Sequence, residues 1–404
     1  MDWGNLGLFA LLTIGHTELM VAVVNRTHAW PLGHQRLRTI RHLHDLAVPL
    51  FPLLLIGGLG LMGPRLLLGG TWADVPVACL AYFALCGLGL LGLVLTVARH
   101  WLQRPPVALV ETRSTVVDAT TQASQSLAGD GKHQSLLKVP GNQVFTFEVS
   151  EKTFRLPHLP AAWDGLTLWH LSDWHYTGTP TLEFYQQVTQ AILERPADCV
   201  IFSGDLMDRD DLRPWIQETL GKLAAPLGCY FILGNHDWYL DTPAVRNELK
   251  SLGWIDVSGK VVEVNHQGHR LLIGGDETPW MGVPPCFSLH EQEHLPDPVA
   301  GVPRDHFRLL VSHTPDHFWR AARDGIDLML SGHTHGGQVQ LPGIGPVFSP
   351  SRYGVRYASG TFYQQETLMH VSRGLGGRHP LRIRCRPEVT RITLRSVDRM
   401  SQDS

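Results

Sequence analysis

Two long apolar runs without any charged side chain lie within the first hundred residues, and they constrain the fold more than any other feature. They extend over residues 46–63 and 75–98. A helix needs roughly 20 apolar residues to cross the hydrocarbon core of a bilayer. We therefore expect both runs to form transmembrane helices.

A third apolar run covers residues 6–24 and is interrupted by His16 and Glu18. Burying such groups in lipid is costly unless they face other helices. We interpret them as packing or interfacial groups rather than as an ion pathway. A cleaved signal peptide is not expected, because the amino end has no basic region. The first hundred residues are thus predicted to be an anchor of two or three helices.

Positive charges predict how this anchor is oriented. Between the first two apolar runs lie four arginines, whereas the turn after the second run carries only Arg65; the four are Arg26, Arg36, Arg38 and Arg41. Loops rich in arginine and lysine remain on the cytoplasmic side. We expect a multi-pass inner-membrane protein whose remaining residues are cytoplasmic.

The rest of the chain has the composition of a linker followed by a globular domain. Residues 101–143 are polar and lack sustained periodicity, which is typical of a linker. From residue 144 to 396 short apolar runs alternate with helical patterns, which predicts an α/β domain; residues 397–404 are a tail. We expect strands at 166–171, 200–203, 230–233, 271–274, 309–312 and 328–331. Helices are expected at 182–193, 212–223 and 243–252, the last capped by Thr242.

Composition excludes some classes of protein. Lys and Arg number 34 against 37 Asp and Glu, so the net charge gives no reason to expect nucleic acid as a partner. The six cysteines form no C-x-x-C pair and predict neither a disulfide framework nor a thiolate zinc site. Histidine is unusually frequent at 22, and imidazole is the commonest metal ligand.

Polar residues follow five of the expected strands directly, at their carboxyl ends. They are of the types that bind metals: Asp173 and His175, Asp205, Asn235, His313, and His333 with His335. Open α/β sheets collect ligand-binding groups at this edge. The donors are carboxylate, amide and imidazole without thiolate, which suits manganese, iron or zinc. Seven ligands are enough for two ions if one carboxylate bridges them.

Spacing within the motifs supports this interpretation. In an extended strand end, residues i and i+2 point the same way, so Asp173 with His175 and His333 with His335 can each face one cavity. The glycines Gly204, Gly234 and Gly332 permit sharp turns and close approach of the backbone. A lone histidine such as His313 is more often structural, but the ligand-type residues that follow the other expected strands favour a ligand role for it.

The ordered set D-x-H, G-D-x-x-D, G-N-H-D, a single His and G-H-x-H resembles the calcineurin-like metallophosphoesterase superfamily over residues 144–394. Later motifs, such as Ser331–Gln338 and Ser372–Gly376, are similar to its membrane-associated branch typified by YkuE and YaeI. That branch is related to UDP-2,3-diacylglucosamine pyrophosphatases of the LpxG type. The resemblance implies a four-layer αββα sandwich.

The resemblance also implies roles for individual residues. One ion would be held by Asp173, His175, Asp205 and His335, and a second by Asp205, Asn235, His313 and His333, with Asp205 as the bridge. His236 would act at the leaving group, oriented by Asp208, and Arg209 would contact the phosphate. Asp237 is interpreted as a supporting residue outside the metal set, and Asp276 as a loop-shaping residue. Residues 277–297 are either a lid over the site or only a long connection.

These observations lead to a functional hypothesis. We expect a membrane-anchored, dinuclear metal-dependent phosphohydrolase that cleaves a phosphodiester or pyrophosphate by metal-activated hydroxide. Its substrate would be lipid-linked or nucleotide-linked, such as UDP-2,3-diacylglucosamine, and the lipid bilayer would be its other partner. The alternatives are a broad phosphomonoesterase or phosphoprotein phosphatase, and a membrane-bound sensor that keeps the metals without turnover.

Overall fold

The computed structural model describes residues 1–285, 287 and 306–397. The chain divides into two compact units. The first, here called the helical unit, consists of residues 1–103 and 341–356; the second, the sheet unit, holds residues 104–340 and 357–404.

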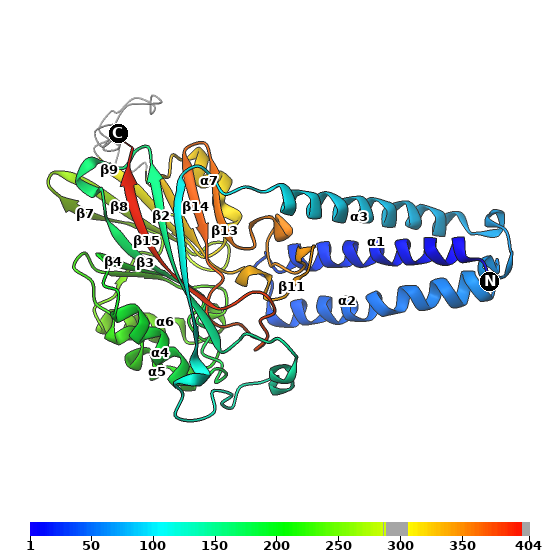
Figure 1. Ribbon diagram of the computed structural model, residues 1–404, viewed down its shortest axis with the longest axis horizontal. Helices are drawn as coiled ribbons and strands as arrows, with labels where there is room; N and C mark the ends of the chain where they lie inside the picture. Colours follow the sequence, from blue (N-terminus) through cyan, green and yellow to red (C-terminus); the bar gives the residue numbers. More distant parts are fainter. Residues whose placement is uncertain (286, 288–305, 398–404) are drawn as a thin grey trace. The chain divides into compact units, whose positions relative to one another are not determined.

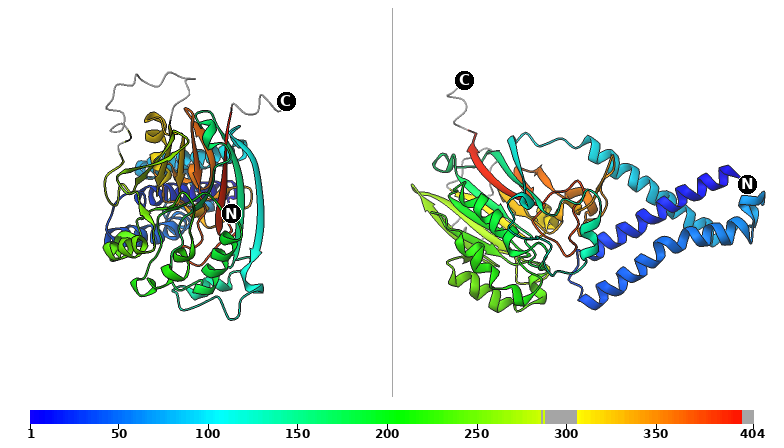
Figure 2. Two further views of the ribbon diagram at one scale, coloured as in Figure 1. Left: turned by 90° about the vertical axis from the view of Figure 1, so that its left-hand side faces the viewer. Right: turned by 60° about the horizontal axis from the view of Figure 1, so that its bottom comes forward.

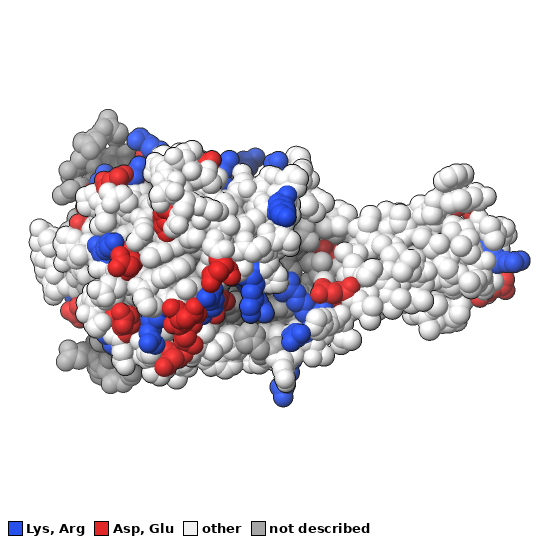
Figure 3. Space-filling model, turned by 90° about the horizontal axis from the view of Figure 1, so that it is seen from below, with Lys and Arg blue, Asp and Glu red and all other residues white. Residues whose placement is uncertain are grey.

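Three long helices form the core of the helical unit (Figure 1): α1 (Trp3–Thr27), α2 (His34–Leu54) and α3 (Val77–Leu102). A π-helical turn, Leu55–Leu61, continues α2. All three helices are long and apolar enough to cross a membrane, as the apolar runs predict. Figure 3 shows a surface almost free of charged side chains along most of their length.

His16 joins the three helices to one another. Its Nδ1 lies 2.6 Å from the Tyr82 hydroxyl on α3, and its Nε2 lies 3.1 Å from the Ala47 carbonyl on α2. The ring also stacks on Phe51 at a centroid distance of 4.3 Å. These contacts satisfy both ring nitrogens inside an apolar bundle, which agrees with the interpretation of His16 as a packing group.

Two sheets form the centre of the sheet unit. The seven-stranded sheet has the order β1-β2-β15-β3-β4-β5-β6, and the six-stranded sheet has the order β13-β14-β10-β9-β8-β7. Within them, β3 to β6 run parallel to one another, and so do β14, β10, β9 and β8. The first sheet contains β1 (Leu109–Asp118), β2 (Thr146–Leu156), β15 (Glu388–Ser396), β3 (Thr167–Leu171), β4 (Cys199–Ser203), β5 (Cys229–Ile232) and β6 (Ile255–Asp256). The second contains β13 (Gly360–Gln364), β14 (Thr367–Val371), β10 (Leu328–Ser331), β9 (His306–Ser312), β8 (His269–Asp276) and β7 (Val261–His266).

The sheet unit has four layers, with helices outside both sheets (Figures 1 and 2). The helices α4 (Leu182–Leu193), α5 (Trp215–Glu218) and α6 (Thr242–Ser251) cover the seven-stranded sheet, and α7 (Phe318–Arg323) lies on the other one. Between the sheets, residues such as Ile201, Phe307 and Leu330 form a fully buried core. The αββα architecture that the family resemblance implies is confirmed. Two short strands, β11 (Gln340–Leu341) and β12 (Gly345–Pro346), pair separately.

Part of the segment expected to be a linker is a strand. β1 pairs antiparallel with β2 and forms an edge of the seven-stranded sheet. Its side chains are exposed on both faces along most of its length, so the alternation of apolar and polar residues that identifies a half-buried strand is missing. Residues 101–143 therefore belong largely to the sheet unit rather than to a free connection.

The expected helices differ in how closely they match the structure. The predicted helix 182–193 is present as α4 with the same bounds. The predicted helix 212–223 is broken into the short α5 between two 3-10 turns, because Pro214 lacks an amide hydrogen and Gly221 disfavours helix. At α6, Asp241 accepts the cap hydrogen bond from Ala244 N, while Thr242 is the first helical residue.

Candidate metal centre

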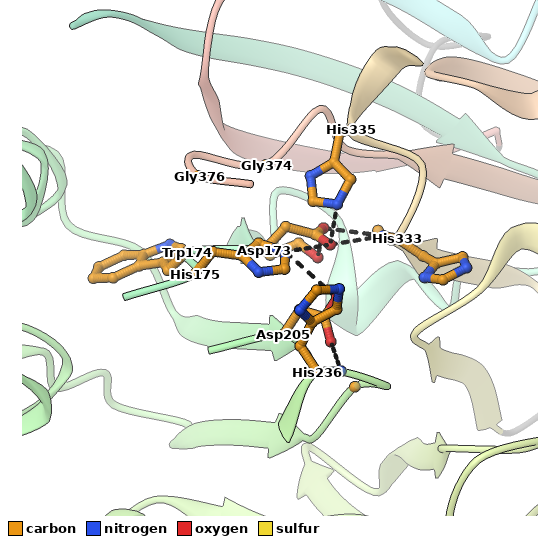
Figure 4. A network of polar contacts seen from close by, with 12 residues as sticks. Asp173, Trp174, His175, Asp205, His236, His333, His335, Gly374 and Gly376 are labelled. Carbon is orange, nitrogen blue, oxygen red and sulfur yellow. Dashed lines mark hydrogen bonds and ion pairs between the residues drawn. The ribbon is translucent and has the colours of Figure 1, made fainter. Parts of the chain in front are cut away.

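Both sheets bring metal-binding side chains to one place. Asp173 and His175 follow β3, Asp205 follows β4 and Asn235 follows β5, all from the seven-stranded sheet. From the six-stranded sheet, His313 follows β9, and His333 and His335 follow β10. Since the strands are parallel within each sheet, their carboxyl ends share an edge. Figure 4 shows Asp173, His175 and Asp205 from the seven-stranded sheet close to His335 from the six-stranded sheet.

The side chains form two groups that have Asp205 in common. In the first group, donor atoms of Asp173, His175, Asp205 and His335 all lie within 4.8 Å of one another. In the second group, the same holds for Asp205, His313 and His333. Oδ2 of Asp205 lies 3.4 Å from His175 Nε2 and 3.3 Å from His313 Nε2. Asn235 joins the second group, because its Oδ1 lies 3.1 Å from His313 Nε2.

Hydrogen bonds on the far side of two rings orient the ligand nitrogens. His175 Nδ1 donates to Asp208 Oδ2 at 2.6 Å, and His313 Nδ1 donates to the Ser203 carbonyl at 2.8 Å. With Nδ1 engaged in this way, each Nε2 faces Asp205 and would offer its lone pair to a cation in place of a proton. Metal-ligating histidines are oriented in this way by a carboxylate or carbonyl.

Unsatisfied buried atoms mark the middle of the cluster. Within the described part of the chain, His175 Nε2, Asp205 Oδ2 and His333 Nε2 are buried without a hydrogen-bond partner. Each such atom costs about 1–3 kcal/mol unless something pairs with it. Together they offer nitrogen and oxygen donors at distances that suit a bound cation. The residues therefore fit divalent metal ions of the borderline class.

Strained backbone holds the ligands in place. Asp173, His175, Asp205, His333 and His335 all have positive φ, between 49° and 71°, a region that non-glycine residues rarely adopt. Such strain persists where the surrounding structure enforces it and is typical of functional sites. Gly332 lets the two sheets approach here, since a Cβ atom on it would lie 1.9 Å from Ser172 Oγ and 2.2 Å from Asp173 Oδ2.

Asp208 and His236 lie directly beside the ligands. His236 Nδ1 donates to Asp208 Oδ1 at 2.5 Å, and the His236 ring meets the His175 ring at a centroid distance of 4.6 Å. The family resemblance implied a contact of Asp208 with His236 alone, but in the structure its other oxygen also holds His175. One carboxylate thus fixes both a candidate ligand and a candidate proton donor.

Burial and charge act in opposite directions on the ionisable groups. Burial alone raises the pKa of Asp205, but the neighbouring His313 and His236 hold it well below its usual range. Burial lowers the pKa of His313, but the Asp205 charge raises it to about 9. Burial dominates at His335 and lowers its pKa to about 3. The centre therefore keeps its carboxylates ionised in a buried environment, which favours cation binding.

Arg209 lies at the edge of the site, with its guanidinium in two ion pairs. It donates to Asp130 Oδ1 at 2.8 Å and to Asp211 Oδ2 at 2.5 Å, and about a third of its side chain is exposed. The expected contact with a phosphate group remains a prediction. For that contact, the guanidinium would donate to the phosphate as well as to Asp130 and Asp211.

Two acidic residues left out of the ligand set have supporting positions. Asp237 accepts hydrogen bonds from the amides of Leu206, Met207 and Gly234. Burial and the Asp205 charge raise the pKa of Asp237 to about 7. Asp276 accepts from Thr278 and pairs with Arg320, so it shapes its own loop.

Trp280 lies beside the candidate ligands, although the sequence pattern gave it no role there. The Trp280 ring lies 4.7 Å from the His333 ring and 5.8 Å from the His313 ring. It comes from the segment 277–297, for which a lid and a connection were both considered. Residues 286 and 288–297 of that segment lie outside the described residues. Only the prolines around Trp280, which interrupt the strand pattern, pointed to this region.

Comparison with known proteins agrees with this geometry. Residues 166–337 match the family model described as calcineurin-like phosphoesterase. The chain belongs to this metallophosphoesterase family, whose members are hydrolases acting on phosphoester bonds. Among its relatives is the metallophosphoesterase YkuE of Bacillus subtilis, which is 34% identical over 257 residues, or 62% of this chain and 86% of YkuE.

Two further relatives have more specific names. The phosphodiesterase YaeI of Escherichia coli is 29% identical, over 55% of this chain and 80% of YaeI. The UDP-2,3-diacylglucosamine pyrophosphatase LpxG of Chlamydia muridarum is 25% identical, over 58% of this chain and 85% of LpxG.

Proposed function

We propose that this protein is a membrane-anchored phosphohydrolase with two metal ions that cleaves a phosphodiester or a pyrophosphate. The observation that carries the proposal is the position of Asp205, which belongs to both groups of candidate ligands. A carboxylate shared in this way is what two neighbouring cations require. The ions would be manganese, iron or zinc, because the donors are oxygen and imidazole nitrogen.

Each residue of the centre has a proposed role. Asp173, His175, Asp205 and His335 would hold one ion, and Asp205, Asn235, His313 and His333 the other. Bound there, the two ions would supply positive charge to the phosphoryl oxygens and lower the pKa of water towards neutrality. His236 would give its proton to the departing oxygen, since the charges of Asp208 and Asp205 raise the pKa of the ring against the effect of burial, and Asp208 orients it.

Attachment to a membrane would narrow the range of substrates that the enzyme meets. The three apolar helices support insertion into a bilayer, and the arginines Arg26, Arg36, Arg38 and Arg41 support a cytoplasmic sheet unit at the inner membrane. Lipid-linked or nucleotide-linked substrates are available at that surface. Similarity to LpxG makes UDP-2,3-diacylglucosamine the first compound to try.

Metal stoichiometry and turnover test the centre. The purified full-length protein is expected to bind two ions per chain, and Asp205→Asn is expected to lose both ions together with activity. Asp324→Asn is the matched control, because Asp324 is an exposed carboxylate that pairs with Arg323 and is in neither group of candidate ligands. Full occupancy or full turnover in Asp205→Asn would refute the shared-ligand arrangement.

Substrate class and orientation need separate measurements. Hydrolysis of UDP-2,3-diacylglucosamine, an aryl phosphodiester and a phosphoprotein, compared under one set of conditions, would separate the three classes. Protease treatment of sealed inside-out vesicles is expected to digest the sheet unit. Protection of the sheet unit in those vesicles would contradict the cytoplasmic orientation.

A further inference from the structure

A cavity of about 290 Å³ lies entirely within the helical unit. Its walls are the carboxyl-terminal halves of α1 and α3, and residues 344–356 close it. None of the candidate metal ligands lines it. The cavity is therefore distinct from the metal centre.

Glycines explain why space is left between the two helices. At Gly15 and Gly89 the backbones touch, since a Cβ atom on Gly89 would lie 2.4 Å from the Gly15 carbonyl. Beyond this crossing the helices separate towards their carboxyl ends (Figure 2). Gly92 lines the cavity one turn further along α3, and a Cβ atom there would meet nothing within 4 Å. The missing side chain at Gly92 thus adds to the open space.

The segment that closes the cavity is firmly attached to both helices. Asn25 is buried on α1, where its amide donates to the Val347 carbonyl and accepts from Ser349 N. On α3, Trp101 Nε1 donates to the Gly343 carbonyl at 2.7 Å. These contacts hold residues 343–349 against the helices, so the cavity is a built feature of the unit.

The lining has two chemically different parts. Deeper along the helices it is apolar, with Leu19, Leu88 and Leu93. Arg26 and Arg99 line it near the helix ends and Arg356 lines it from the closing segment, whereas its single carboxylate, Glu18, precedes Leu19 on α1. Across all the residues that the structure describes, neither Arg26 nor Arg99 has a carboxylate within 4.0 Å. A guanidinium presents a planar fork of donors that matches phosphate geometry.

We propose that this cavity binds an anionic membrane phospholipid, with the phosphate at the arginines and an acyl chain against the apolar wall. The inference rests on the proposed membrane insertion but not on hydrolysis. Basic pockets between membrane helices bind lipid headgroups by this combination of charge and apolar surface. A free phosphate ester would use only the arginines and would leave the apolar wall in contact with water.

The first test compares three ligands on delipidated full-length protein in detergent, with binding measured by native mass spectrometry. They are phosphatidylglycerol, phosphatidylcholine with the same acyl chains, and soluble glycerol 3-phosphate. We expect phosphatidylglycerol to bind on the order of tenfold more tightly than phosphatidylcholine and glycerol 3-phosphate not to bind. Equal affinity for the two lipids would overturn the phosphate site, and tight binding of glycerol 3-phosphate would overturn the lipid assignment.

The second test fills the cavity. Gly92→Leu places an apolar side chain into it without a backbone clash, and leucine favours helix more than glycine does. We expect this variant to lose phosphatidylglycerol binding. Gly87→Leu is the matched control, since Gly87 is on the same helix, has equally open space and does not line the cavity. Unchanged binding in Gly92→Leu, or equal loss in Gly87→Leu, would overturn the proposal.

Charge variants distinguish a specific phosphate site in the cavity from general electrostatic attraction to a basic surface. The double variant Arg26→Gln and Arg99→Gln is expected to lose on the order of tenfold in affinity for phosphatidylglycerol. Arg41→Gln is expected to lose little, because Arg41 is on α2 outside the cavity. Equal losses would mean that the lipid is only attracted to a basic surface. Carbonate extraction of membranes checks insertion of each variant, so failed insertion is not mistaken for failed binding.

Discussion

His236 and Asp208 form a hydrogen bond of 2.5 Å beside the candidate metal centre, and the second oxygen of the same carboxylate holds His175 at 2.6 Å. A candidate proton donor and a candidate metal ligand therefore depend on one side chain. The two roles of Asp208 can be tested separately. Metal content reports on His175, and the pH dependence of kcat reports on His236.

Asp208→Asn is expected to lower kcat about hundredfold, because general acid catalysis of this kind contributes at least that much. Burial lowers the pKa of His236, while the charges of Asp208 and Asp205 raise it. Removing the Asp208 charge lowers that pKa, so the basic limb of the pH profile for kcat should move to lower pH. Metal analysis of the same sample shows whether His175 still binds. An unmoved basic limb would argue against His236 as the acid.

Trp280→Ala is expected to weaken metal retention by about tenfold, since groups that fix a ligand ring typically contribute 10–100-fold to affinity. The indole packs on His333 and His313, and it is itself buried. Trp280→Phe keeps a ring there and should retain most of the metal. Competition with a chelator measures the loss. Trp319→Ala removes an exposed indole and serves as the control; an equal effect there would point to general destabilisation.

Arg209→Ala is expected to lower kcat/KM about tenfold or more, if one charged hydrogen bond to the phosphate is lost. Asp130→Asn breaks an ion pair of Arg209 but leaves its guanidinium in place. Steady-state kinetics on the same phosphodiester compares the two variants. Equal kinetics would assign Arg209 a structural role in holding the loop of Asp130.

Glu388 should make the stability of the sheet unit depend on pH. Burial alone raises the pKa of this carboxyl, but Arg373 and Lys152 hold it well below its usual range. A carboxyl with a depressed pKa stabilises the fold above its ordinary pKa, and this contribution is lost as the pH falls below about 5. The melting temperature of the wild type should therefore fall on acidification.

Glu388→Gln is expected to cost about 2 kcal/mol at pH 7, because it removes one of the two carboxylates that pair with Arg373 and leaves only Glu148. The variant should also lose less stability than the wild type on acidification. Thermal unfolding at pH 7 and pH 4.5 gives both values. Glu111→Gln, in an exposed pair with Arg113, should change little. Parallel pH curves for Glu388→Gln and the wild type would contradict this account.

The sequence by itself determined the apolar helices, six strands of the two sheets and the seven candidate ligands, but not the long strands β2 and β15. These features are local: apolar runs, alternation and a polar residue directly after a strand can all be recognised within a few neighbouring residues. The edge strand β1 was missed because its side chains are exposed on both faces, and the helix expected at 212–223 was interrupted at Pro214.

Only the tertiary structure decided how these pieces act together. Asp208 bridges His175 and His236, Trp280 covers His333, and Arg209 pairs with Asp130, which lies in a segment expected to be a linker. The cavity between α1 and α3 likewise depends on residues 344–356, far along the chain. Such contacts join residues distant in sequence. They follow from packing two sheets face to face and helices side by side, which no local pattern encodes.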